Sequence, residues 1–108
     1  MVSETAVEEE ILAKGLTAPR LTPGLIDATI VAADYHVFPG SQLTVCCLTL
    51  RNGFTVVGES ACVSPANFDA EIGRKVAWTK AREKIWALEG YLLKQRQHEQ
   101  ALMQNGVR

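Results

Sequence analysis

The chain has 108 residues, of which 47% are hydrophobic and 21% charged, and its formal net charge is −1. These values fit one small globular domain and exclude a disordered chain of low hydrophobicity. No apolar run approaches the ~20 residues that span a bilayer, and the acidic N-terminus is unlike a signal peptide, so we expect a cytoplasmic protein without membrane contact. Three cysteines, two of them adjacent, do not suggest a disulfide framework.

Charge is divided unevenly along the chain. Residues 1–63 hold three Lys and Arg against seven Asp and Glu, whereas residues 64–108 hold eight against five. The second half is therefore net positive, and it could meet phosphate groups or the acidic half of a neighbouring copy. A solvated helix surface is the alternative interpretation of each single charge.

The N-terminal part predicts an arm and a short helix. Residues 1–20 are expected to form an acidic arm with one or two helical turns, followed by a single α+β domain over residues 21–108. Thr22 and Pro23 are typical of a helix start, because threonine caps free amides and proline suits the first turn. We predict a short helix from there to about Ala33, with one apolar face buried.

A β-hairpin is predicted over residues 42–63. Residues 42–50 and 54–63 are rich in β-branched and apolar side chains, and Asn52-Gly53 between them is the strongest short hairpin signal. A two-residue loop would place Thr49 opposite Val56. Both faces of the ribbon carry apolar groups, so both need a cover, one from the chain's own helix and the other from a partner chain.

A long helix is predicted from Ala70 to about Gln97, with Gly90 as the place for a bend or break. Its first apolar track, expected to pack on the hairpin, consists of Phe68, Ile72, Val76 and Thr79. Its second track has the spacing of helices packed side by side; it consists of Trp78, Ala81, Ile85, Leu88 and Leu92. The short helix after Thr22 could cover this track within the chain, but a helix of another subunit is the preferred cover. The expected fold class is α+β: an antiparallel hairpin or small sheet packed against a long C-terminal helix, with a short N-terminal helix.

Catalytic and metal chemistry are not predicted. The chain has only two histidines, His36 and His98, and neither lies in a motif. His36 and the cysteines lack the spacing of a zinc site, and the glycine signatures of nucleotide folds and the GxSxG elbow are missing. We therefore expect no enzyme, no metal and no cofactor.

Cations and aromatic side chains remain, and together they suit a nucleotide. Arginine pairs with phosphate through two parallel hydrogen bonds, and an aromatic face can stack a base. The candidates are Arg51, Phe54, Arg74, Lys75, Trp78, Lys80, Arg82, Lys84 and Trp86. For the two tryptophans, packing in the core or at an interface is the preferred interpretation.

Three segments of the chain carry a resemblance to a known family. They are NGFTVVGESACV at residues 52–63, NFD at residues 67–69 and KIWALEGYLL at residues 84–93. In combination, over about residues 43–94, they resemble small tailed-phage and prophage proteins that include the Thoeris anti-defence sponge proteins. The resemblance implies a multimer without turnover that sequesters cyclic ADP-ribose signals, and in some members cyclic oligonucleotides, in pockets where subunits meet.

The resemblance also implies the residues of the site. That pocket uses a sheet aromatic, an asparagine near the helix start, basic residues late in the helix, and a leucine-acid pair before a glycine. The matching positions here are Phe54, Asn67, Arg82, Lys84, Leu88 and Glu89. Glu83 and Ala87 stand where the sponge proteins place arginines, which leaves a different ligand, or none, as an alternative.

Two functions follow from these patterns. The first is a phage anti-defence protein that holds a cyclic ADP-ribose-type signalling nucleotide between the subunits of a homo-oligomer, in the cytoplasm of the bacterial host. The alternative is an oligomeric phage interaction protein that binds a host protein or nucleic acid. Nucleic acid is the less expected partner, because the net charge is close to neutral.

Overall fold

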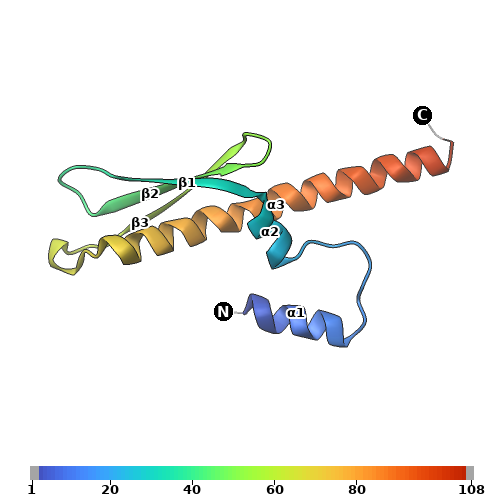
Figure 1. Cartoon of the computed structure of the whole chain (residues 1–108), viewed down its shortest axis with the longest axis horizontal. Coiled ribbons are helices and arrows are strands. Elements are labelled where there is room, and N and C mark those ends of the chain that lie inside the picture. Colours follow the sequence, from blue (N-terminus) through green and yellow to red (C-terminus); the bar gives the residue numbers. More distant parts are fainter. Residues whose placement is uncertain (1–2, 107–108) are drawn as a thin grey trace.

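The computed structural model describes residues 3–106 and places a long helix across one face of a small antiparallel sheet (Figure 1). The sheet has the strand order β1-β2-β3. This confirms the predicted α+β fold class. The elements are α1 (Glu4–Ala13), α2 (Pro23–Thr29), β1 (Ile30–Val37), β2 (Leu43–Leu50), β3 (Thr55–Ala61), the short 3-10 helix η1 (Pro65–Asn67) and α3 (Ala70–Gln104). Within residues 3–106, no helix combines the length and apolar character that a membrane crossing demands.

The predicted hairpin forms between β2 and β3, but its predicted register is wrong by one residue. Thr49 pairs with Thr55 rather than with Val56. Gly53 has a φ of 89°, whereas no non-glycine residue of the described chain has a positive φ, so the two-residue type I′ turn is excluded. The loop has three residues and ends at Gly53, as in a type I turn followed by a left-handed glycine. A one-residue change of register moves the side chains of one strand to the other face relative to its partner, so Val56 shares a face with Leu48 rather than with Thr49.

Helix α2, the short helix predicted to run to about Ala33, ends earlier than predicted, because the last residues of the predicted helix join the sheet. Thr22 caps α2 as expected, with its Oγ1 accepting a hydrogen bond from the Leu25 amide at 3.1 Å. The helix ends at Thr29, and Ile30–Val37 forms β1, a strand that the sequence interpretation missed. This segment gains backbone partners along the whole of β2, which outweighs the weak helical spacing of its apolar residues.

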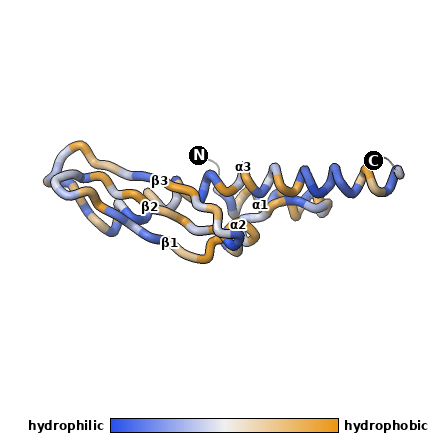
Figure 2. Tube along the Cα trace, turned by 90° about the horizontal axis from the view of Figure 1, so that it is seen from above, coloured by the Kyte–Doolittle hydropathy of each residue, from blue (hydrophilic) through white to orange (hydrophobic). Residues whose placement is uncertain are grey.

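Helix α3 runs for 35 residues without a break, so the predicted interruption at Gly90 is wrong. The Asp69 carboxylate starts the helix by accepting a hydrogen bond from the Ile72 amide at 3.0 Å. The second half of the helix extends beyond the sheet, and the described chain measures 62 × 34 × 20 Å. Figure 2 shows that the projecting C-terminal end is largely hydrophilic.

The core lies between the sheet and α3. The buried apolar residues are Ile26, Cys46, Leu48, Leu50, Val56, Ala77, Ala81 and Ile85. The helix presents small residues to the sheet, at the four-residue spacing of Gly73, Ala77 and Ala81. The first predicted track is therefore wrong: its apolar members Phe68, Ile72 and Val76 are exposed. Part of the second track is also reassigned, since Ala81 and Ile85 pack on the chain's own sheet.

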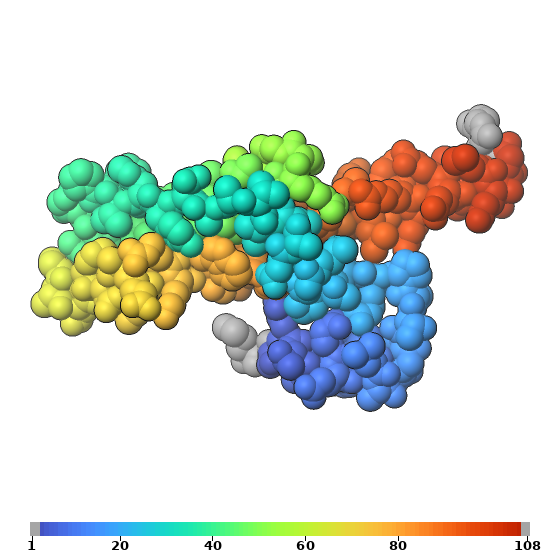
Figure 3. All heavy atoms as spheres, viewed as in Figure 1, coloured from blue at the N-terminus to red at the C-terminus, as the bar shows by residue number. Residues whose placement is uncertain are grey.

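The N-terminal helix α1 is longer than the one or two turns predicted for the acidic arm. It has 10 residues, and none of them is buried. An exposed linker over residues 14–19 joins it to the body. In the space-filling view α1 forms a separate lobe beside α2 (Figure 3).

Candidate functional site

A groove of about 410 Å³ lies between the β2–β3 turn and the second half of α3. We call it the turn groove. The sheet side contributes Arg51, Asn52 and Phe54, and successive turns of α3 contribute Leu88, Glu89, Tyr91, Leu92, Gln95 and Arg96. The hairpin turn holds the first set in place, because the Asn52 side chain accepts a hydrogen bond from the Phe54 amide at 3.0 Å.

The groove combines exposed aromatic rings with charges of both signs. Phe54 is 56% exposed and Tyr91 75% exposed, so both rings offer a face to a ligand. The Arg51 guanidinium lies 3.5 Å from the Glu89 carboxylate, whose side chain is only 12% exposed. Arg96 adds a second guanidinium. Such a set can stack a planar ring and pair with an anionic group beside it.

Three of the six predicted site residues meet in the turn groove. They are Phe54, Leu88 and Glu89. Asn67 lies elsewhere, as the last residue of η1, in a small pocket beside the ends of β2 and β3 that are remote from the hairpin turn. The Lys84 ammonium donates to the Val57 carbonyl at the edge of β3, outside the groove.

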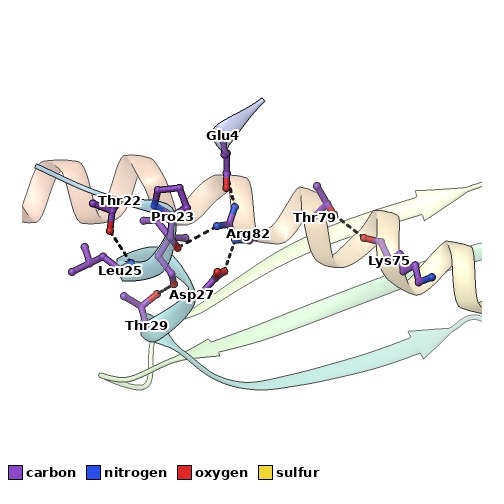
Figure 4. A network of polar contacts seen from close by, with 10 residues as sticks. Glu4, Thr22, Pro23, Leu25, Asp27, Thr29, Lys75, Thr79 and Arg82 are labelled. Carbon is purple, nitrogen blue, oxygen red and sulfur yellow. Dashed lines mark hydrogen bonds and ion pairs between the residues drawn. The ribbon is translucent and has the colours of Figure 1, made fainter. Parts of the chain in front are cut away.

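Arg82 is also absent from the turn groove, because the chain's own carboxylates hold it (Figure 4). Its Nε donates to Asp27 Oδ1 at 2.7 Å and its Nη1 to Glu4 Oε2 at 2.6 Å. A third guanidinium nitrogen donates to the Pro23 carbonyl at 3.3 Å, and the group lies 5.9 Å from the ring centre of Trp78. The hydrogen bond to Glu4, more than that to Asp27, raises the pKa of Arg82 above its usual value. Arg82 therefore ties α1, α2 and α3 together.

We expect Arg82→Met to loosen α1 while leaving the sheet intact. The substitution removes the charge-assisted bonds to Asp27 and Glu4 but retains most of the side-chain volume. Both carboxylates are about half exposed and can be resolvated, so the expected loss of unfolding free energy is only about 1–2 kcal/mol. Urea denaturation and limited proteolysis in the linker measure the effect. Lys80→Met, at an exposed position of α3, is the matched control, and equal behaviour of the two variants would contradict this role.

The sequence interpretation missed several residues of the turn groove. Arg51 was recognised as a candidate cation but not placed in the site, and Tyr91, Gln95 and Arg96 were not considered for it. The sequence did contain a signal for the α3 residues of the turn groove. Leu88 is followed at three, four, seven and eight residues by groove-lining positions, the spacing of one helix face.

The described residues offer no grouping for a metal. Nowhere in residues 3–106 do three His, Cys, Asp or Glu side chains gather at a distance that could hold an ion. The three cysteines are free. Cys46 is buried, and burial raises the pKa of its thiol. His36 packs edge to face against Phe38, with ring centres 4.6 Å apart.

The fold and the groove define a small α+β protein with a projecting helix and an open cationic and aromatic groove at its hairpin turn. The model of the phage protein family described as N4 Gp49/phage Sf6 gene 66 matches residues 21–97, and the chain belongs to this family. The expectation that the chain belongs to a family of phage proteins is thereby confirmed. Helix α1 lies outside the matched part. No curated protein and no solved structure matches the chain.

Proposed function

We propose that this phage protein binds a cyclic nucleotide-type immune signal, of the cyclic ADP-ribose class, and sequesters it without turnover in the host cytoplasm. One observation carries the proposal. Phe54 is far in the chain from the adjacent residues Leu88 and Glu89, yet all three line one groove together with two arginines. The groove volume of about 410 Å³ lies within the range that small-molecule sites occupy.

The groove offers a complementary partner for each part of such a ligand. The faces of Phe54 and Tyr91 suit the purine, because stacking on an aromatic ring does not depend on base identity. Arg51 and Arg96 suit the two phosphates, since a guanidinium presents donors in pairs to phosphate oxygens. The Glu89 carboxylate can accept hydrogen bonds from ribose hydroxyls.

The proposal includes a homo-oligomer, because one chain supplies only part of the implied site. Asn67 lies beside the strand ends remote from the hairpin turn, so it can contribute to the turn groove only from a second copy. The groove is also open on one side, where a second copy could limit the escape of the ligand. Sequestration requires slow release rather than chemistry, and enclosure between subunits serves that end.

Calorimetry with cyclic ADP-ribose isomers tests this function, and Phe54→Ala is expected to weaken binding about tenfold to a hundredfold, the usual contribution of one stacked base. Arg51→Ala should weaken it to a similar extent. Lys80→Ala, at an exposed cation of α3 outside the turn groove, is the control. The absence of heat with every cyclic ADP-ribose isomer and cyclic oligonucleotide, on protein that melts cooperatively, would remove the proposal.

A host-protein partner is the second candidate, favoured by the exposed apolar rings of the turn groove. Phe54 and Tyr91 are of the residue types that dominate protein interfaces. In that case Phe54→Ala and Arg51→Ala would both abolish retention of the host protein, and no nucleotide would give heat in calorimetry. Duplex DNA would instead show binding that weakens steeply with salt.

A further inference from the structure

The two edges of the sheet differ in how they are closed. At β3, the outward-facing Val57 carbonyl already accepts a hydrogen bond from the Lys84 ammonium. At β1, every residue from 31 to 37 is exposed. Helix α3 packs extensively on β3 and β2 but much less on β1, so β1 overhangs the helix in the described structure. Within residues 3–106, β1 is therefore the less covered edge of the sheet.

The open edge carries few of the features that usually prevent strand pairing, since Asp34 is the one carboxylate on it. Natural edge strands carry lysine, proline or a bulge to block a further strand. The pairing of β1 is irregular only between Ile30 and Ala32, at its start. From Ala32 to Val37 the strand contains no lysine, arginine or proline. A regular edge of six residues is thus available to another strand.

The backbone groups on this edge can be identified from the ladder. The Phe38 amide donates to the Leu43 carbonyl at 3.3 Å, so the even-numbered residues of β1 point their backbone groups toward β2. The odd-numbered residues Ala33, Tyr35 and Val37 therefore point theirs outward. An added strand would bond to these three residues.

Charge selects one register for pairing with a second copy of β1. An antiparallel pair centred on Tyr35 places Asp34 of each copy opposite His36 of the other, on the face of the sheet away from α3, with Ala33 opposite Val37. Centring the pair on Asp34 instead would oppose two carboxylates, which is unfavourable. Centring it on Ala33 would oppose Asp34 to Ala32, and centring it on His36 would oppose Asp34 to Phe38; either register leaves both carboxylates without a partner.

The same register would cover apolar surface beneath β1. Tyr35 faces the helix side, where it lines an open groove of about 600 Å³ together with Arg74 and Trp78. The twofold axis of an antiparallel pair is perpendicular to the sheet, so both copies of α3 would lie on one side and the second β1 would extend over this groove. Tyr35 and Val37, now 40% and 39% exposed, would lose accessible surface.

We propose that two copies of the chain associate through antiparallel pairing of their β1 strands about Tyr35, which joins their sheets into one continuous six-stranded sheet. The interface deepens the proposed function, since it rests on the homo-oligomer included there and names the surface that forms it. It does not require a ligand, so association and ligand binding can be measured separately.

A charge exchange tests the register. Native mass spectrometry and sedimentation at micromolar concentration should show a dimer or a multiple of one. His36→Glu should raise the dissociation constant about tenfold or more, because it places two carboxylates opposite each other twice, and Asp34→Lys should also raise it, because it removes the carboxylate that can accept a hydrogen bond from His36 of the other copy. The double variant should return to within about threefold of the parent. Glu59→Lys, the same change of charge at the other edge, is the control and should leave the mass unchanged. A double variant as weak as the singles would overturn the register.

A backbone variant tests the edge itself. Ala33→Pro removes an outward N–H that β2 does not use, and proline is tolerated at such positions of edge strands. We expect the circular dichroism spectrum and cooperative melt to persist while the mass falls by half. A parent protein that is monomeric, or an Ala33→Pro variant that keeps the parent mass, would refute the interface. Calorimetry on the same samples separates the two proposals. A protein that dimerises through β1 but gives no heat with any nucleotide would support the proposed interface and contradict only the proposed ligand.

Discussion

Gly58→Ala is expected to lower the unfolding free energy by about 3 kcal/mol or more, a large part of the stability of a domain this small. A Cβ at this position would lie less than 3.0 Å from the Ala81 amide nitrogen and the Ala77 carbonyl oxygen. Both atoms belong to the backbone of α3, so no side chain can move aside. The helix would have to lift off β3, which opens the core along its length.

Gly90→Ala is the matched control, with an effect of opposite sign. Gly90 lies within α3, and a Cβ there would meet only the Leu21 side chain, at an ordinary 3.6 Å. Alanine should therefore stabilise the helix by about 0.5–1 kcal/mol. Urea denaturation followed by circular dichroism measures both variants. A Gly58→Ala protein with the parent's midpoint would show that the helix does not approach the strand as closely as described.

Local signals predicted the elements of the fold well. Thr22 caps α2, Asn52-Gly53 lies in a hairpin turn, and a long helix follows Asp69, because each of these features depends on a few neighbouring residues. The strand β1 depends on a distant partner, and its residues are as compatible with a helix as with a strand. Register depends on the φ of Asn52, which decides between a two-residue and a three-residue loop and which the residue type alone does not fix.

The helix face that meets the sheet was missed for a different reason. The largest apolar residues were expected to form the contact, yet the surface is made by Gly73, Ala77 and Ala81. These are small because α3 lies directly against the backbone of β3 at Gly58, so little space remains for side chains. Hydrophobic size predicts burial only where the two elements are kept apart by their side chains.

The candidate site was predicted in part, and the limits are physical. Phe54 and the pair Leu88 and Glu89 gather in the turn groove. Arg82 does not, because Glu4 and Asp27 bind it, and Glu4 belongs to a helix outside the family match. The partner of a buried arginine cannot be read from its neighbours in sequence when that partner lies 78 residues away.

The extended shape of the chain has a consequence for assembly. Its radius of gyration is 18.1 Å, against roughly 13 Å for a compact chain of this length. The excess comes from the projecting end of α3 and from elements that cover little of each other, such as β1 and α1. Surface left open in this way supports the proposed association of copies, since a second copy can bury what a single chain cannot.

Ile85→Glu is expected to unfold the chain rather than to release folded subunits. The sequence pattern placed Ile85 in a seam between helices of different subunits, where a charge would cause dissociation. In the structure Ile85 is fully buried against the chain's own sheet, in one cluster with Leu48 and Ile26. A carboxylate there would lie in the core without a partner, at a cost of several kcal/mol in addition to the lost apolar contacts.

Ile72→Glu is the matched control for this prediction. It introduces the same change on the same helix, but Ile72 is 59% exposed, and a carboxylate in the first turn is favoured by the helix dipole. Circular dichroism and sedimentation should show a folded Ile72→Glu protein and an Ile85→Glu protein without a cooperative melt. A folded Ile85→Glu monomer would restore the seam between subunits, and it would require Ile85 to face a second chain rather than Leu48.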